Sequence, residues 1–196
     1  MNKRIKKLFS FFVVVSTISL LGFQLLAYPS DVQAQNYDWI IQFGSSVSTS
    51  TLDITSDSDG NLYITGNIQG AFPGQVSSGY SDAFVRKLDG NGNEVWTRQF
   101  GTSQPDGAAG IAIDQQGNIY IGGYTRGIFP GQVSAGGNDI FVRKYDNNGN
   151  VIWTRQFGTS YEDSASKLVV DNTGNIYFVG PISSGASDAV ITNLWC

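Results

Sequence analysis

The segment Asn93-Glu94-Val95-Trp96-Thr97-Arg98-Gln99-Phe100-Gly101-Thr102-Ser103 recurs almost unchanged at residues 150–160 as Asn-Val-Ile-Trp-Thr-Arg-Gln-Phe-Gly-Thr-Ser. A shorter copy, Trp-Ile-Ile-Gln-Phe-Gly, begins at Trp39. The tryptophans Trp39, Trp96 and Trp153 are spaced 57 residues apart. A fixed period of this size is typical of architectures that stack one structural unit on the next. The chain is therefore expected to consist of copies of one unit.

Each unit is expected to contain four short β-strands. Two apolar runs flank a turn of the form Asp-x-x-Gly-Asn, as at residues 114–118, where the Asp caps the turn and the Gly supplies a positive φ. A Phe-Pro-Gly-Gln connection follows at residues 72–75 and 129–132. A strand Asp-x-Phe-Val-Arg-Lys, a second Asp-x-x-Gly-Asn turn and the tryptophan strand complete the unit. The runs are short and β-branched, with no helical periodicity.

Four antiparallel strands per unit, with large rings to bury on their faces, predict an all-β fold, a β-propeller of about three blades with a 57-residue period. A solenoid is disfavoured because its repeats usually span about 20 to 45 residues. The expected boundaries are an orphan fourth strand at 37–43, blade 1 at 51–100, blade 2 at 108–157 and an incomplete blade 3 at 165–193. In blade 3, Asp188-Ala189 comes eight residues early, and no tryptophan strand follows.

These motifs resemble the SBBP repeat, a family named for the seven-bladed β-propeller. The resemblance rests on the Asp-x-x-Gly-Asn-Ile-Tyr hairpin, Asp-Ala-Phe-Val-Arg-Lys, Trp-Thr-Arg-Gln-Phe-Gly-Thr and Phe-Pro-Gly-Gln, and it covers residues 37–193. It implies a propeller from secreted or surface-associated bacterial proteins, cyanobacterial ones among them. It implies no reaction, because the family as a whole has no assigned chemistry.

Three blades are too few to close a ring, since propellers typically have about four to eight. One hypothesis is a homo-oligomer formed by strand exchange, in which the orphan strand 37–43 of one copy completes blade 3 of another, giving six blades. Cys196, the only cysteine, would then lie near the joint and could cross-link two chains. The alternative is a truncated reading frame, or a fragment of a longer propeller gene.

The N-terminus is typical of a secretory signal peptide at residues 1–34. Basic residues precede an apolar run from Leu8 to Ala27, and Val32-Gln33-Ala34 matches a cleavage site. The predicted location is secreted, either extracellular or at the periplasmic or cell surface. The apolar run spans 20 residues, so an uncleaved membrane anchor is the alternative.

Composition narrows the function classes. Residues 35–196 carry eight basic and fifteen acidic residues, a net charge of −7 that argues against nucleic-acid binding. The chain has no histidine, which removes His-dependent catalytic triads and the commonest zinc ligand. Residues 89–93 and 146–150 resemble half of a calcium loop but lack the Glu at its twelfth position, so they are interpreted as turns. No catalytic, cofactor-binding or metal-binding residue is predicted.

Other prominent residues have structural interpretations. The tryptophans could stack on sugars but are expected to pack between blades. Arg98 and Arg155 are expected to lie on aromatic rings and to pair with a turn Asp. The pairs Arg86-Lys87 and Arg143-Lys144 are expected to be solvated strand ends. The Phe-Pro-Gly-Gln connection is the best recognition loop in the sequence, although Phe72 and Phe129 could simply fix it to the blade.

The function expected from the sequence is a secreted, non-catalytic module that binds a protein or glycan through one face of the propeller. A structural cell-surface repeat protein, or a fragment without independent activity, is the second hypothesis. A glycosidase or lyase that uses paired carboxylates is the third.

Overall fold

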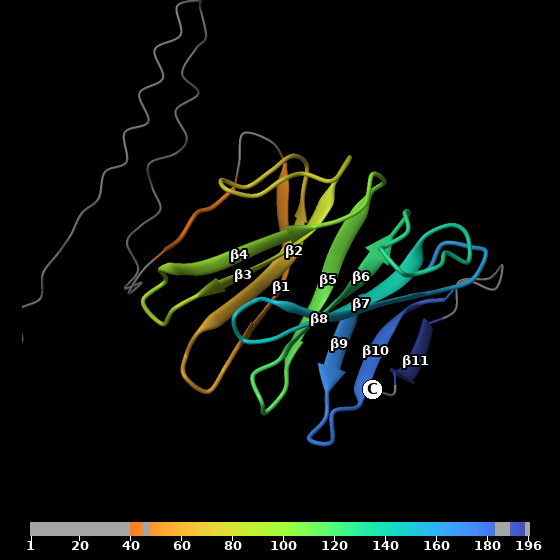
Figure 1. Cartoon of the computed structure of the whole chain (residues 1–196). Helices are drawn as coiled ribbons and strands as arrows, with labels where there is room; N and C mark the ends of the chain where they lie inside the picture. The colour runs from red at the N-terminus through yellow and green to blue at the C-terminus, as the bar shows by residue number, and fades with distance from the viewer. Residues whose placement is uncertain (1–39, 45–47, 183–188, 195–196) are drawn as a thin grey trace, which may run out of the picture. The chain divides into compact units, whose positions relative to one another are not determined.

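The computed structural model describes residues 40–44, 48–182 and 189–194, and within these ranges the chain forms eleven strands in three antiparallel sheets (Figure 1). Each sheet is one blade, and its strands follow one another in chain order. In blade 1 the strands are β1 (Thr49–Ser56), β2 (Leu62–Ile68), β3 (Asp82–Leu88) and β4 (Glu94–Phe100). Blade 2 contains β5 (Asp106–Ile113), β6 (Ile119–Thr125), β7 (Asp139–Tyr145) and β8 (Val151–Phe157).

The third sheet is built from β9 (Lys167–Val170), β10 (Ile176–Pro181) and β11 (Ala189–Leu194). The predicted all-β fold, with antiparallel four-stranded sheets and about three blades, is confirmed. The signal peptide at 1–34, Trp39, Asp188 and Cys196 lie outside the described residues. Of the expected strand 37–43, only residues 40–43 are described, and these belong to no strand.

The hairpin turns follow the pattern expected from Asp-x-x-Gly-Asn. At residues 114–118, one oxygen of Asp114 accepts hydrogen bonds from the backbone N–H groups of Gln116 (3.0 Å) and Asn118 (2.8 Å). The other oxygen accepts from the Asn118 side chain (2.7 Å) and the Tyr120 hydroxyl (2.9 Å). Gly117 has a φ of 80°, which a residue with a side chain rarely adopts. These carboxylates are therefore used by their own turns.

Acidification is expected to weaken these turns. Burial alone would raise the pKa of Asp114, but the hydrogen bonds from Asn118 and Tyr120 outweigh it and hold the pKa below its usual value. A carboxylate with a lowered pKa stabilises the fold above the unfolded pKa of roughly 4 and loses that effect as the pH falls. Asp114→Ala should cost about 1 to 3 kcal/mol at pH 7. In urea unfolding followed against pH, the difference from the unchanged chain should shrink below about pH 4, and a constant difference would contradict this account.

The blades pack face to face, and two apolar clusters fill the joints. We call the side of a blade that meets the following blade its back face, and the side that meets the preceding blade its front face. The first cluster joins the back face of blade 1 to the front face of blade 2; its members include Tyr63, Ala83, Val85, Phe100, Ile111, Ile121, Phe129, Phe141 and Tyr145, with Trp96 packed against it. The second cluster joins blades 2 and 3 in the same way through Tyr120, Ile140, Val142, Leu168, Ile176 and Phe178, with Trp153 and Phe157.

The first strands of neighbouring blades are also in contact, β1 with β5 and β5 with β9. Gly110 and Gly122 allow the closest approach to blade 3, since a Cβ on Gly122 would lie 2.6 Å from a methyl carbon of Leu168. The part of the chain that the structure describes has no helix long and apolar enough to cross a membrane.

Candidate interaction site at the loop end of the blades

The two ends of each blade differ. One end carries the short Asp-x-x-Gly-Asn turns, and we call it the turn end. The other carries the long connections 69–81 and 126–138 and the passages from one blade to the next, and we call it the loop end. The Phe-Pro-Gly-Gln motif, the best recognition loop in the sequence, lies at the loop end in both complete blades.

One glutamine per complete blade, buried in blade 2 and half-buried in blade 1, fixes the long connection. In blade 2 the side-chain oxygen of Gln156 accepts a hydrogen bond from the backbone N–H of Phe129 (3.0 Å). The side-chain amide of Gln156 donates to the Gly127 carbonyl and to Asp139, both at 2.8 Å. Its backbone N–H donates to the side-chain oxygen of Gln132 (2.9 Å), the last residue of the motif. Gln99 makes the equivalent contacts in blade 1 with Phe72, Gly70, Asp82 and Gln75.

The phenylalanine of the motif anchors the connection to the sheet. Phe129 is buried, with its ring centroid 5.3 Å from that of Phe141. Phe72 is buried against Phe84 in the same way, at 5.0 Å. The structural role that the sequence left open for these two residues is therefore present. A ligand at the loop end would have to contact other residues.

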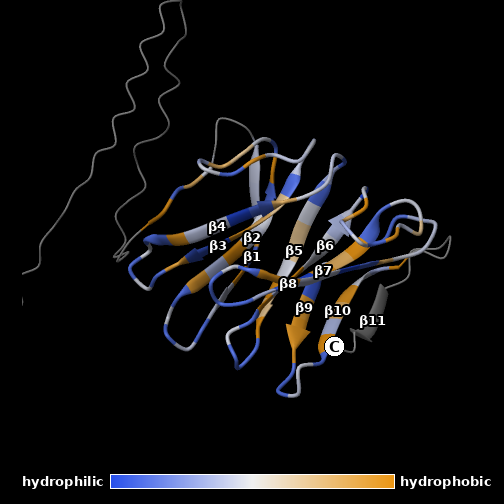
Figure 2. Cartoon of the chain, in the orientation of Figure 1, coloured by the Kyte–Doolittle hydropathy of each residue, from blue (hydrophilic) through white to orange (hydrophobic). Residues whose placement is uncertain are grey.

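Apolar side chains at the tips of the connections remain in solvent. Val76 is 81% exposed, and Val133, its equivalent 57 residues later, is 78% exposed. Further exposed apolar residues at this end are Tyr80, Ile128 and Tyr161. Figure 2 shows hydrophobic segments among the long connections, whereas the turns at the other end are mainly hydrophilic. The loop end thus presents repeated apolar tips on connections that hydrogen bonds hold in place.

Beneath the tips, two buried aspartates meet where blade 1 passes into blade 2. A Cβ on Gly101 would lie 2.4 Å from an oxygen of Asp82 and 2.7 Å from one of Asp106, so the two carboxylates are close neighbours. One oxygen of each is buried without a hydrogen-bond partner among the described residues. Burial raises the pKa of Asp106, hydrogen bonds from Thr125 and Thr102 oppose this, and the charge of Asp82 raises it further.

The prediction of solvated basic strand ends is wrong. Arg86 and Lys87 are both buried. The Arg86 guanidinium lies between the rings of Phe43 (4.3 Å) and Phe72 (4.7 Å), and its Nε donates to the Thr97 hydroxyl (2.8 Å). In blade 2, Arg143 lies between the rings of Phe100 and Phe129 in the same manner, and Lys144 lies over the Tyr120 ring. These pairs do lie next to strand ends, since β3 ends at Leu88 and β7 at Tyr145, but aromatic rings cover them there instead of solvent.

The tryptophan strand behaves largely as expected. The Trp96 ring packs on Tyr63 (6.2 Å between centroids), and its N–H donates to the Asn147 carbonyl of the next blade (3.2 Å). Arg98 lies over the Trp96 ring at 5.3 Å. Arg98 was expected to pair with a turn Asp; its guanidinium donates to the backbone carbonyls of Asn148 and Gly149 in the turn that Asp146 begins. Hydrogen bonds from Asn150 lower the pKa of Asp146, and the charge of Arg98 lowers it further. The hydrogen bonds from Trp96 and Arg98 therefore attach the second turn of blade 2 to β4, the outer strand of blade 1.

The carboxylates do not form an obvious catalytic pair on the first strands. Positions 53, 110 and 167 are equivalent in the repeat and hold Asp, Gly and Lys. Asp53 forms an ion pair with Lys167 and accepts a hydrogen bond from the backbone N–H of Ile111 (3.1 Å). Asp53, on blade 1, thus contacts blades 2 and 3, and its role is structural.

Comparison with known proteins agrees with this architecture. The family model of the SBBP β-propeller repeat matches residues 38–73, 95–130 and 152–184. The regulatory protein FlaEY of Caulobacter vibrioides is 31% identical over 177 residues, which is 80% of this chain. The chain spans only 18% of the length of that relative. The second and third matches begin within β4 and β8, the strands that hold Trp96 and Trp153, and continue into the following blade. The chain therefore belongs to the SBBP β-propeller repeat family.

Proposed function

We propose that the chain is a non-catalytic module that binds a protein partner through the loop end of its blades. The observation that carries the proposal is the pair of exposed valines, Val76 and Val133, which recur on connections fixed by Gln99 and Gln156. A fixed connection loses little conformational entropy on binding, so its exposed apolar groups are available for association. Valine tips fit an apolar protein surface better than a sugar, which is usually recognised by aromatic stacking and polar groups. The name of the relative, a regulatory protein, mentions no reaction and is consistent with this proposal.

The test compares two double variants of similar chemistry. Val76→Ser with Val133→Ser removes the tips at the loop end. Val95→Ser with Val151→Ser, the matched control, changes two half-exposed valines at the turn end. Each protein is used to capture partners from extracts of the organism that carries the gene. We expect one specific partner to be lost tenfold or more with the loop-end variant and retained by the control.

Two results would contradict the proposal. Equal capture by both double variants would place binding elsewhere, and capture of polysaccharide alone would indicate a glycan-binding module. Both variants should keep the unfolding midpoint of the unchanged chain, because exposed apolar residues contribute little to stability.

Secretion is part of the proposal and is supported by the basic and apolar pattern of residues 1–34. The exported protein should begin at Gln35, which N-terminal sequencing can establish. A chain that keeps residues 1–34 in the membrane fraction would instead be anchored to the cell surface.

A further inference from the structure

The outermost faces of blades 1 and 3 are copies of the two faces that meet inside the chain, and the described residues leave large parts of them uncovered. Ile111 on the front face of blade 2 is 4% exposed, and Leu168 at the same position of blade 3 is 5% exposed. Ile54, the equivalent residue of blade 1, is 58% exposed. Nothing among the described residues covers this face as blade 1 covers blade 2.

The back face of blade 3 shows the complementary difference. Ala112 on the back face of blade 2 is 8% exposed, whereas Val169, its equivalent in blade 3, is 61% exposed. Val179 is exposed beside it, and an apolar pocket of about 140 Å³ lies between them, lined also by Tyr177 and Lys167. The joint between blades 2 and 3 buries the equivalent positions of blade 2, and Thr55, the equivalent of Val169 in blade 1, is half-buried.

Phe43 makes the contacts with blade 1 that Phe100, from the preceding blade, makes with blade 2. Its ring lies 6.2 Å from that of Phe84 and 4.3 Å from the Arg86 guanidinium. Phe100 holds the same position on blade 2, 5.6 Å from Phe141 and 4.3 Å from Arg143. Phe100 is the last residue of β4, the fourth strand of the blade before. Phe43 therefore holds the position that the last residue of a preceding blade's fourth strand would hold, although residues 40–43 form no strand within the chain itself.

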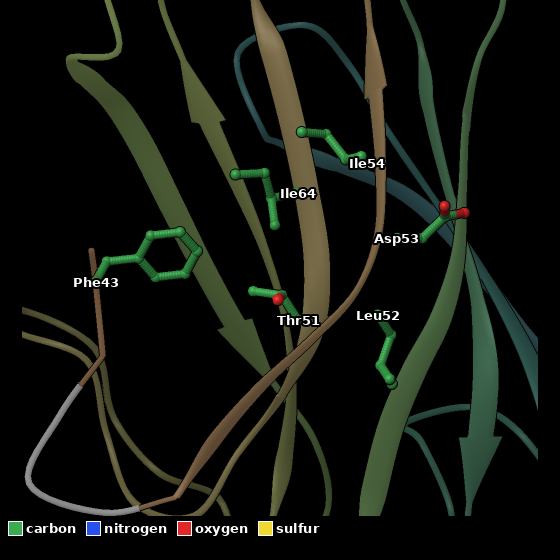
Figure 3. A pocket seen from close by; sticks show the side chains of 6 residues that line it. All are labelled: Phe43, Thr51, Leu52, Asp53, Ile54 and Ile64. Atoms are coloured by element: carbon green, nitrogen blue, oxygen red, sulfur yellow. The ribbon is translucent and has the colours of Figure 1, made fainter. Parts of the chain in front are cut away.

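An apolar groove of about 360 Å³ adjoins Phe43, as Figure 3 shows, with Ile54 and Ile64 around it. Blade 3, in turn, has three strands among the described residues, so β11 is an edge strand that can accept one more. In blade 1, β3 pairs with β4 so that Ala83 lies opposite Phe100. The same register between β11 and residues 40–43 of another copy would place Ala189 opposite Phe43, and Ile191 opposite Ile41.

We infer that the occupant of both faces is a second copy of this chain, joined head to tail. The front face of blade 1 packs on the back face of blade 3 of the partner, and residues 40–43 pair with the partner's β11 as a fourth strand. The argument for this occupant is self-complementarity, because the chain already makes the same pair of faces meet twice. Contacts of this kind close into a ring only when their rotation permits it. Two copies give six blades, within the range of about four to eight that propellers use.

The test uses the full chain, expressed with its N-terminal segment so that processing can occur, and measures mass by light scattering under reducing conditions. We expect a dimer for the unchanged chain. Ile54→Asp and Val169→Asp should each give a monomer, because each places a charge in both joints of the ring. Val151→Asp is the matched control: Val151 is 53% exposed, outside these faces, and this variant should remain a dimer.

Mixing the two monomeric variants separates this inference from misfolding. In a mixture of Ile54→Asp and Val169→Asp, one joint receives both charges and the other receives neither. An open heterodimer should therefore form, which two misfolded proteins could not do. If the unchanged chain is monomeric, the inference is overturned. The two exposed faces would then be covered by another segment or by further blades of a longer chain. A dimer broken by Ile54→Asp but not by Val169→Asp would also overturn it, because it would indicate front-to-front pairing.

Discussion

Replacing Phe141 with alanine is expected to lower the free energy of unfolding by about 3 to 5 kcal/mol, the usual cost of removing a fully buried aromatic ring. Phe141 is completely buried on the front face of blade 2. Its ring contacts Phe129, which anchors the connection, and Phe100, which ends the last strand of blade 1. The substitution therefore opens a cavity in the joint between blades 1 and 2. The same cavity removes support from Phe129 and so from the connection 126–138, which carries the proposed binding residue Val133.

Urea unfolding measures this loss, with Ile152→Ala as the control. Ile152 is half exposed on β8, so its truncation should change stability by no more than about 0.5 kcal/mol. A loss below about 1 kcal/mol for Phe141→Ala would mean that the joint between blades 1 and 2 is not a packed core.

Asp106→Asn should stabilise the protein at neutral pH by about 1 to 3 kcal/mol, because it removes a buried charge that has an unpartnered oxygen. Burial and the neighbouring Asp82 hold the pKa of Asp106 above its usual value. A carboxylate with a raised pKa in the folded state destabilises the fold above that pKa, and the penalty disappears as the pH falls through it. The asparagine keeps an oxygen that can accept from Thr102 and places no second charge beside Asp82.

The gain should therefore be present at pH 7 and vanish towards pH 4. Thermal unfolding of both proteins across this range measures it. Asp59→Asn changes an exposed turn residue and should show no comparable gain. A destabilised Asp106→Asn at pH 7 would contradict the electrostatic account and would mean that the carboxylate has a partner that asparagine cannot replace.

Much of the fold could be predicted from the period alone. The spacing of Trp96 and Trp153, together with the Asp-x-x-Gly-Asn turns, predicted four-stranded units because strand and turn chemistry are local. The register of β4 on β3 could not be predicted at the same level, since it includes a shift beside Lys87. The positions of Arg86 and Lys87 were missed for a related reason. Their burial depends on Phe43 and Asn147, which lie far away in sequence.

The sequence could point to the long connections as a candidate site, but not to the contacts that hold these connections in place. The Phe-Pro-Gly-Gln motif drew attention to the long connections, but no sequence pattern linked Gln99 to Gln75, which lies 24 residues earlier in the chain. The recurrence of Gln at 99 and 156, each directly before the phenylalanine that ends its strand, was the available signal. The pair Asp82 and Asp106 had a similar signal, because Asp139 and Asp163 repeat it. What a single sequence did not supply was the contact that brings each pair together.

The front face of blade 1 and the back face of blade 3 are proposed to meet between two copies of the chain, as neighbouring blades meet within it. Hydrogen exchange of the backbone amides of β11 (Ala189–Leu194) and of residues 40–43 tests this proposal most directly. The account predicts slow exchange in the unchanged chain for the amides of β11 that point away from β10, and rapid exchange at the same amides in Ile54→Asp. Equally rapid exchange in both proteins would show that no fourth strand is added to blade 3, and would contradict the account.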